Sequence, residues 1–262
     1  MLQSSPSSAD RRLRELIARQ ESKRGFLIAF EGADGSGKTT QRKLFKTWLR
    51  SVGHEVVTFK WNASPIMKPI LRARKLARSL SAEEYCVLSA AGFRDQLESE
   101  VLPALWEGKV VVADRFLFTA LARDSARGLD LHWIMNVYLP LFWPDIVFYF
   151  DVEAELASQR VSVNRKPSYY EAGQDITNIA DPVRSHREFV GRVIQEYQAL
   201  SKIFQFLKVD GRQTIYEQHR TIRQLFMLGH RRPWAEWNTE ALLEWLSARE
   251  SSAGLEKDGQ ES

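Results

Sequence analysis

The stretch Gly32–Thr39 carries the residues with the clearest chemistry in this sequence. It satisfies G-x-x-x-x-G-K-[ST], the pattern of a phosphate-binding loop. Glycines let successive backbone N–H groups turn toward one phosphate, and the Lys38 ammonium adds a full charge toward the β- and γ-phosphates of a nucleotide. The Thr39 hydroxyl is the residue type that ligates Mg²⁺ at this position. The alternative is a glycine-rich turn that binds nothing.

The segments on either side of this loop argue against that alternative. Phe26–Phe30 is an apolar run with the length of a buried parallel strand. Thr40–Leu49 then has apolar residues at helical spacing. A helix in this place directs the positive end of its dipole at the bound phosphate. The order of strand, glycine loop and helix is the one that phosphate binding needs.

A second informative stretch is Lys109–Arg115, a β-branched apolar run that ends in Asp and Arg. In phosphate-loop enzymes a carboxylate at a strand end holds the hydration shell of Mg²⁺, which assigns a metal role to Asp114 together with Thr39. Arg115 would then lie beside the transferred phosphoryl group. The alternative is an Asp114 helix cap with Arg115 in a surface ion pair, and the phosphate loop upstream favours the functional interpretation.

The rest of the chain alternates between strand and helix patterns. The sequence predicts further strands at residues 55–60, 145–150 and 203–209, and helices at 82–106, 131–141, 153–160, 185–202 and 214–228. Alternation with apolar strands predicts an α/β fold, a parallel sheet covered by helices on both faces. Residues 164–184 are polar, basic and without periodicity, which makes this segment a candidate lid. The basic segment 69–80 is interpreted as a solvated helix face, with substrate phosphate binding as the alternative.

Composition narrows the classes of partner. The chain has 262 residues, 37 basic and 33 acidic side chains and a net charge of +4, an excess too small to indicate a stable nucleic-acid complex. One cysteine, Cys86, excludes an intramolecular disulfide and a thiolate metal cluster. The apolar runs are strand-sized, so no membrane association is expected. We expect a cytoplasmic protein.

Three regions are predicted along the chain. Residues 1–24 form a charged extension with a helix at Ala9–Gln20, residues 25–229 form the main domain with its lid at about 160–184, and residues 230–262 form a tryptophan-rich extension. The tryptophans of this last region pack on the main domain or form an oligomer contact, for example in a homodimer. Residues 251–262 are predicted to be disordered.

The motifs together resemble those of thymidylate kinases, a family of phosphate-loop nucleoside-monophosphate kinases. Phe30–Gln41 is similar to the family's F-E-G-x-D-G-x-G-K-T-T-Q loop, and Asp114–Phe116 to its D-R-Y/F motif. Phe93–Asp95 resembles a segment with an arginine near the base, and Val209–Gly211 the end of the last strand. The resemblance spans roughly residues 26–225. It implies a five-stranded parallel sheet, helices on both faces, a lid, and the use of ATP and Mg²⁺.

The resemblance also implies roles for single residues. Lys38 and Arg115 would act in catalysis, Asp34 would contact the acceptor sugar, and Arg94 would hold the acceptor near its base. ATP would be bound by Gly32, Asp34, Gly35, Ser36, Gly37, Lys38, Thr39 and Thr40. The family carries a catalytic arginine either in the loop or in the lid. Because residue 35 is glycine, the lid must supply it, and Arg160 and Arg165 are the candidates.

The acceptor side departs from the family pattern. Arg123 and Asp124 stand where the family has Tyr and Gln, exchanging a stacking wall and an amide for a charge pair. After the second strand, Lys60 and Trp61 replace the family's R-E-P, and Lys60 is the substitute for its phosphate-binding arginine. We therefore predict acceptor contacts from Asp34, Lys60, Trp61, Arg94, Arg115, Arg123 and Asp124.

These features favour ATP-dependent phosphorylation of a nucleoside monophosphate, with dTMP converted to dTDP as the default reaction. One alternative is a kinase of the same fold that acts on a modified nucleotide or another small phosphorylated acceptor. A second is a nucleotide-binding regulatory or interaction protein that uses the terminal extensions as contact surfaces.

Overall fold

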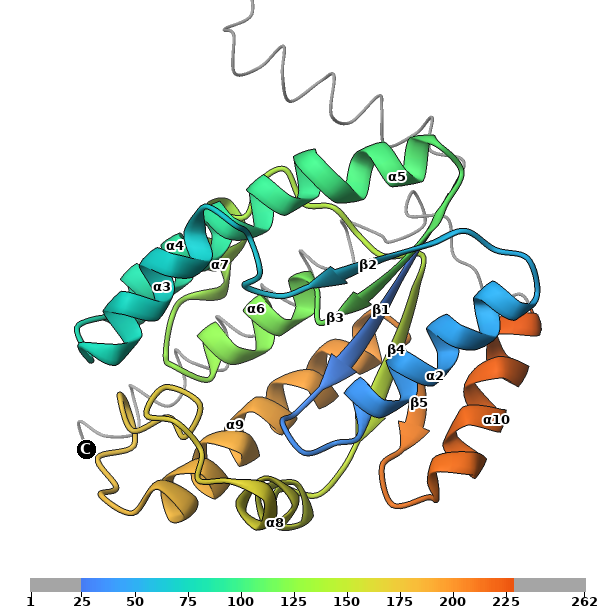
Figure 1. Cartoon of the computed structure of the whole chain (residues 1–262). Coiled ribbons are helices and arrows are strands. Elements are labelled where there is room, and N and C mark those ends of the chain that lie inside the picture. Colours follow the sequence, from blue (N-terminus) through green and yellow to red (C-terminus); the bar gives the residue numbers. More distant parts are fainter. Residues whose placement is uncertain (1–24, 229–262) are drawn as a thin grey trace, which may run out of the picture.

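A five-stranded, fully parallel sheet forms the centre of the molecule (Figure 1). The computed structural model describes residues 25–228. The strands are β1 (Phe26–Gly32), β2 (Val56–Lys60), β3 (Val110–Asp114), β4 (Ile146–Asp151) and β5 (Leu207–Asp210), in the spatial order β2-β3-β1-β4-β5. The predicted parallel sheet is confirmed.

The side chains of β1 alternate between the two faces of the sheet, and this alternation explains why helices cover both faces. Ile28 and Phe30 belong to a core with residues of α2 (Lys38–Ser51) and α10 (Ile215–Met227). Leu27 and Ala29 point to the other face, where a larger core includes residues of α4 (Ala82–Gln96), α6 (Leu117–Ser125) and α9 (Pro182–Ile203). Successive side chains of a strand point to opposite faces, so an uninterrupted apolar strand needs helices on both sides.

The remaining helices connect the strands and cover the second face. They are α3 (Met67–Leu76), α4 (Ala82–Gln96), the π-helix η1 (Leu97–Val101), α5 (Leu102–Trp106), α6 (Leu117–Ser125), α7 (Leu131–Val137), α8 (Ala154–Asn164) and α9 (Pro182–Ile203). Figure 1 shows α2 and α10 side by side on one face, with α6 and α9 across the sheet.

The parallel strand register places the polar residues at the carboxyl ends of the strands on the same side of the sheet. Phe30 pairs with Asp114, Lys60 with Asp114, and Asp151 with Asp210. The connection from β1 leads to β2 at one end of the strand order, whereas the connection from its neighbour β4 leads to β5 at the other end. A crevice forms at such a switch point, and the glycine loop opens into it.

Several predicted boundaries were wrong. Helix α9 begins at Pro182 instead of Ser185, because the Asp181 side chain accepts a hydrogen bond from the Arg184 N–H and proline is tolerated in the first helical turn. Helix α8 continues to Asn164, four residues beyond the prediction. The predicted helix at 82–106 is interrupted by η1 just before Pro103, whose ring clashes with regular α-helical geometry.

The terminal extensions lie outside the described residues. This applies to the predicted helix Ala9–Gln20, to the tryptophan-rich region and to the predicted disorder of residues 251–262. Between residues 25 and 228, none of the helices is long and apolar enough to cross a membrane.

Candidate active site

The glycine loop adopts a backbone that only glycine tolerates well. Gly32, Gly35 and Gly37 have φ angles of 141°, 82° and 94°. A Cβ placed on Gly35 would lie 2.2 Å from the Ala157 carbonyl oxygen of α8. Any side chain at residue 35 therefore collides with α8, which gives a structural reason why this loop has no arginine of its own.

Lys38 is buried at the start of α2 and faces the inside of the loop. Its Nζ donates to the Ala33 carbonyl oxygen at 2.9 Å and lies 3.9 Å from Oδ1 of Asp34. Burial and the neighbouring Arg115 charge lower the pKa of Lys38 to about 8. A bound phosphate supplies negative charge next to this ammonium and favours its charged form.

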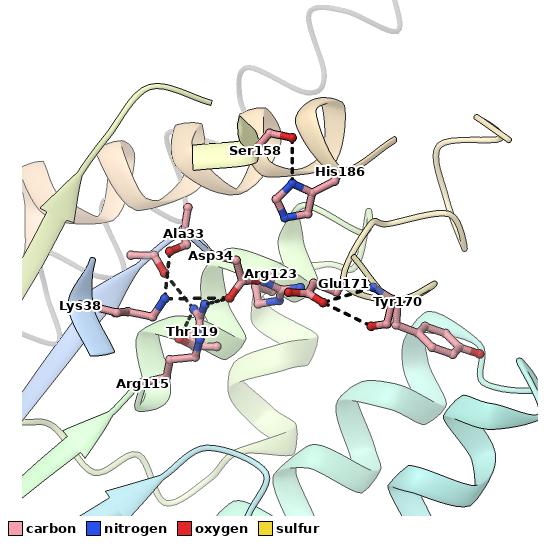
Figure 2. Close-up of polar contacts among 12 residues, drawn as sticks. Ala33, Asp34, Lys38, Arg115, Thr119, Arg123, Ser158, Tyr170, Glu171 and His186 are labelled. Carbon is pink, nitrogen blue, oxygen red and sulfur yellow. Dashed lines mark hydrogen bonds and ion pairs between the residues drawn. The ribbon is translucent and has the colours of Figure 1, made fainter. Parts of the chain in front are cut away.

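Asp34 is the point on which the positive side chains converge (Figure 2). Its Oδ1 accepts from Arg115 at 2.5 Å and its Oδ2 from Arg123 at 2.8 Å. Arg115 also donates to the Gly32 carbonyl oxygen at 2.8 Å, and its φ of 68° is unusual outside glycine. Burial opposes ionisation of Asp34, but the charges of Arg115, Arg123 and Lys38 outweigh it and hold its pKa well below the usual range.

Asp114 and Thr39 meet as predicted for a magnesium site. The Thr39 hydroxyl lies 3.5 Å from Oδ2 of Asp114, so two oxygen ligands of the type Mg²⁺ prefers lie together beside the loop. The Arg42 Nε donates to the same Oδ2 at 3.2 Å. Within the loop, the buried Ser36 hydroxyl has no hydrogen-bond partner among the described residues. These residues fit a magnesium-bound nucleotide.

A pocket of about 230 Å³, here called the charged pocket, extends from the loop between α4 and α6. It is lined by acidic, basic and aromatic side chains: Asp34, Asp124 and Glu171, Lys75, Arg115 and Arg123, and Trp61, Tyr85 and Tyr170. The Tyr85 and Tyr170 rings are stacked with centroids 5.7 Å apart. Phosphate-binding cations at one end and aromatic rings in the walls suit a mononucleotide.

The predicted charge pair between Arg123 and Asp124 is wrong. Adjacent residues on a helix point about 100° apart, so the two side chains cannot face each other. Arg123 pairs with Asp34, whereas the buried Asp124 takes a hydrogen bond from the Cys86 thiol. Burial raises the pKa of Asp124 to about 6.

Both candidate arginines of the lid lie near the loop. Arg160 donates to the Gly211 carbonyl oxygen at 2.9 Å and lies 3.5 Å from the Gly35 carbonyl oxygen. Arg165, directly after α8, is 58% exposed and makes a two-pronged ion pair with Glu171 at 2.7 and 2.5 Å. Arg160 is thus held against the backbone, whereas Arg165 reaches into solvent.

The segment after Arg165 is anchored to the main domain. The Tyr170 hydroxyl accepts from the Leu80 N–H at 2.8 Å, and Arg127 donates to the Tyr170 carbonyl oxygen at 2.7 Å and to Asp175 at 2.9 Å. Glu171 also lies near Asp34 and His186, with ligand atoms of all three within 4.8 Å of one another (Figure 2). The lid therefore meets the phosphate loop at Glu171.

Two predicted acceptor contacts do not line the charged pocket. Arg94 donates to the Leu139 carbonyl oxygen and lies 3.7 Å from Glu98. Tyr85 and Ser89 face the pocket from α4, and Arg94, five residues after Ser89, points about 140° away from that face. Lys60 is exposed at the end of β2 and also lies outside the lining. The remaining predicted contacts, including Trp61, do line it.

Sequence reasoning missed Glu31 and Arg127. Glu31 is fully buried and accepts from the Phe116 N–H, the Thr119 hydroxyl and the Tyr197 hydroxyl, each at 2.7 Å. These bonds tie β1 to α6 and α9 directly behind Arg115. A single acidic residue at the end of an apolar strand was the available signal for Glu31, and the i, i+4 spacing from Arg123 was the signal for Arg127.

Comparison with known proteins agrees with this geometry. The family description for thymidylate kinase matches residues 30–220. A probable thymidylate kinase 2 of Saccharolobus solfataricus is 33% identical over 204 residues, covering 77% of this chain and 95% of that protein. A probable thymidylate kinase of Pyrococcus horikoshii is 36% identical over 146 residues, or 53% and 71% of the two chains. The thymidylate kinase of Geobacillus thermodenitrificans is 29% identical over 167 residues, or 61% and 74%.

The family match covers most of the chain, from the end of β1 into α10, and includes both the glycine loop and the lid. This chain belongs to the thymidylate kinase family.

Proposed function

We propose that this protein transfers the γ-phosphoryl group of ATP to the phosphate of dTMP, giving dTDP and ADP. The observation that carries the proposal is the convergence of Lys38, Arg115 and Arg123 on Asp34, where the phosphate loop opens into the charged pocket. One cation of this group faces the loop and two face the pocket. Two phosphate-binding regions thus meet at one point, as a reaction between two phosphates needs.

The reaction needs positioning more than covalent help from the protein. An oxygen of the acceptor phosphate attacks the γ-phosphorus, the bond from that phosphorus to the bridging oxygen breaks, and ADP leaves. Lys38 and the loop N–H groups hold the donor phosphates. Arg115, fixed to the Gly32 carbonyl oxygen, lies between donor and acceptor and neutralises charge on both. Asp34 orients the two arginines and is also proposed to meet the acceptor sugar hydroxyl.

Arg165 is the proposed catalytic arginine of the lid. Its partner Glu171 lies close to Asp34, so a change of partner from the carboxylate to the transferred phosphoryl group needs only a short movement. Arg160 supports the loop from behind through the Gly35 and Gly211 carbonyl oxygens. Mg²⁺ held near Thr39 and Asp114 would neutralise the donor phosphates. The cytoplasmic location and a homodimer contact stay predictions.

The test is product formation by the purified full chain with ATP, Mg²⁺ and dTMP, with ADP and dTDP separated by anion-exchange chromatography. Lys38→Ala should lower kcat by about 100-fold or more, because it removes a charge that stabilises the transferred group. Thermal melting of the variant controls for folding. If the wild type forms no more dTDP than the variant, the proposal is wrong.

A further inference from the structure

The inner end of the charged pocket carries polar groups that phosphate chemistry does not use. Asp124 lies on α6, seven residues after its first residue, Leu117, and roughly 10 Å further along the helix axis. That distance is the scale of a mononucleotide measured from its phosphate to its base. With the acceptor phosphate at Arg115, Asp124 lies at the position of the base. This inference rests on the proposed function, because it concerns the same pocket.

Ser89 is the second polar group at this end. It is 2% exposed, it lines the pocket, and its hydroxyl has no hydrogen-bond partner among the described residues. It lies one helical turn after Tyr85 on α4, so both side chains face the pocket. A buried hydroxyl without a partner is costly, and a ligand that offers a hydrogen-bonding group there removes the cost.

The chemistry of Asp124 differs from that of the amide which it replaces. An ionised carboxylate only accepts hydrogen bonds, whereas an amide both donates and accepts. Within the protein, Asp124 accepts a hydrogen bond from the Cys86 thiol, which is a weak donor. A base that presents an N–H group to Asp124 is therefore favoured, and a base that presents only a carbonyl oxygen there is repelled.

Pyrimidine bases differ at this edge. Thymine offers one N–H, at N3, between two carbonyl oxygens. Cytosine offers a 4-amino group and an N3 acceptor, which match the Asp124 carboxylate and the Ser89 hydroxyl. We propose that Asp124 and Ser89 read the acceptor base, and that this pocket takes a 4-aminopyrimidine nucleoside monophosphate, such as dCMP, as a second acceptor beside dTMP.

The charge of Asp124 gives this selectivity a pH dependence. Burial raises the pKa of its carboxyl to about 6. The charged or titratable groups that act on it are Arg123 and Arg127 from its own helix, Cys86 from α4, Tyr138 next to α7 and Asp175 from the lid segment. Above pH 6 the carboxylate prevails and repels the thymine oxygens, so preference for the amino base rises with pH.

The experiment compares kcat/KM for dCMP and dTMP with the purified full chain, saturating ATP and Mg²⁺. At pH 8 we expect the two values to lie within about 10-fold of each other. Asp124→Asn provides an N–H donor for a thymine carbonyl oxygen and removes the charged acceptor of the cytosine amino group. It should lower the dCMP-to-dTMP ratio by about 10-fold, because charge-assisted hydrogen bonds are about twice as strong as neutral ones. Glu155→Gln, which changes an exposed carboxylate of α8 that pairs with Arg187 outside the pocket lining, should leave the ratio unchanged.

A second measurement uses only the wild type, in case Asp124→Asn does not fold. The dCMP-to-dTMP ratio should rise between pH 5.5 and pH 8, since both acceptors carry the same phosphate and its own titration cancels in the ratio. Turnover of dTMP without any turnover of dCMP would overturn this inference alone. A ratio unaffected by both Asp124→Asn and pH would also overturn it. If neither nucleotide is phosphorylated, both this inference and the proposed function are wrong.

Discussion

The proposed donor and acceptor sides of this active site differ in the groups that form them. On the donor side, main-chain groups and glycines shape the loop, and its backbone is packed against α8 through Gly35 and Ala157. On the acceptor side, charged side chains from the phosphate loop, α6 and the lid segment hold one another in place, as Asp34 holds Arg123 and Glu171 holds Arg165. A loop that binds through its main chain accepts few substitutions, whereas side chains in an ion-pair network can be substituted while the fold stays the same.

The largest effect that would separate the two sides is expected at Gly35. Gly35→Arg places a Cβ 2.2 Å from the Ala157 carbonyl oxygen at a positive φ, so the loop or α8 must move and ATP binding should be lost. Gly53→Ala is the matched control, since Gly53 has a φ of 92° but nothing within 4 Å of its Cβ. It should cost about 1 kcal/mol of unfolding free energy and keep ATP binding. Denaturant unfolding measures the stability of the two variants, and nucleotide titration measures their ATP affinity. Normal ATP binding by Gly35→Arg would show that the loop accepts a side chain at residue 35.

A smaller effect is expected at Arg165 on the acceptor side. Arg165→Ala should lower kcat by about 100-fold with little change in KM for ATP, because the proposed contact forms mainly in the transition state. Arg187→Ala removes a similarly exposed arginine that pairs with Glu155 away from the pocket, and its kcat should stay within about twofold of the wild type. An equal loss of ATP affinity in Arg165→Ala would instead identify Arg165 as a ground-state ligand.

The smallest effect concerns Glu31, which joins the two sides. Burial raises the pKa of Glu31 despite its hydrogen bonds from Thr119 and Tyr197. The folded protein therefore binds this proton more tightly than the unfolded chain does, so the contribution of Glu31 to stability is largest at low pH and falls as pH rises through the raised pKa. Glu31→Gln cannot titrate, and its melting temperature should fall less between pH 5 and pH 8 than that of the wild type. Parallel melting curves at the two pH values would show that Glu31 is already charged in the folded protein.

The difference between the two sides also explains what the sequence could predict. The loop follows from a local pattern, because it depends on residue types within one strand–loop–helix unit. The sheet and the meeting of Thr39 with Asp114 follow from the apolar strand patterns, because the parallel pairing of β1 with β3 brings the two strand ends together. Arg94 shows the limit. Its direction depends on how α4 is rotated about its axis against the pocket, and Arg94 lies about 140° from Ser89, which lines the pocket. A motif that matches in sequence does not fix this rotation. The partners of Arg123 and Arg127 lie on other elements, and their positions depend on packing that one sequence does not reveal.

The contact between Gly35 and Ala157 limits how this enzyme can change in evolution. The sequence predicts that the lid supplies the catalytic arginine, because residue 35 of the loop is glycine. In this protein a first mutation to arginine at residue 35 meets the backbone of α8 before the new side chain can reach a phosphate. The nearest atoms are the carbonyl oxygen, carbonyl carbon and Cα of Ala157, so no change of side chain at residue 157 makes room. An arginine at residue 35 therefore requires a shift of α8, and we expect such a substitution to arise only together with others that move this helix.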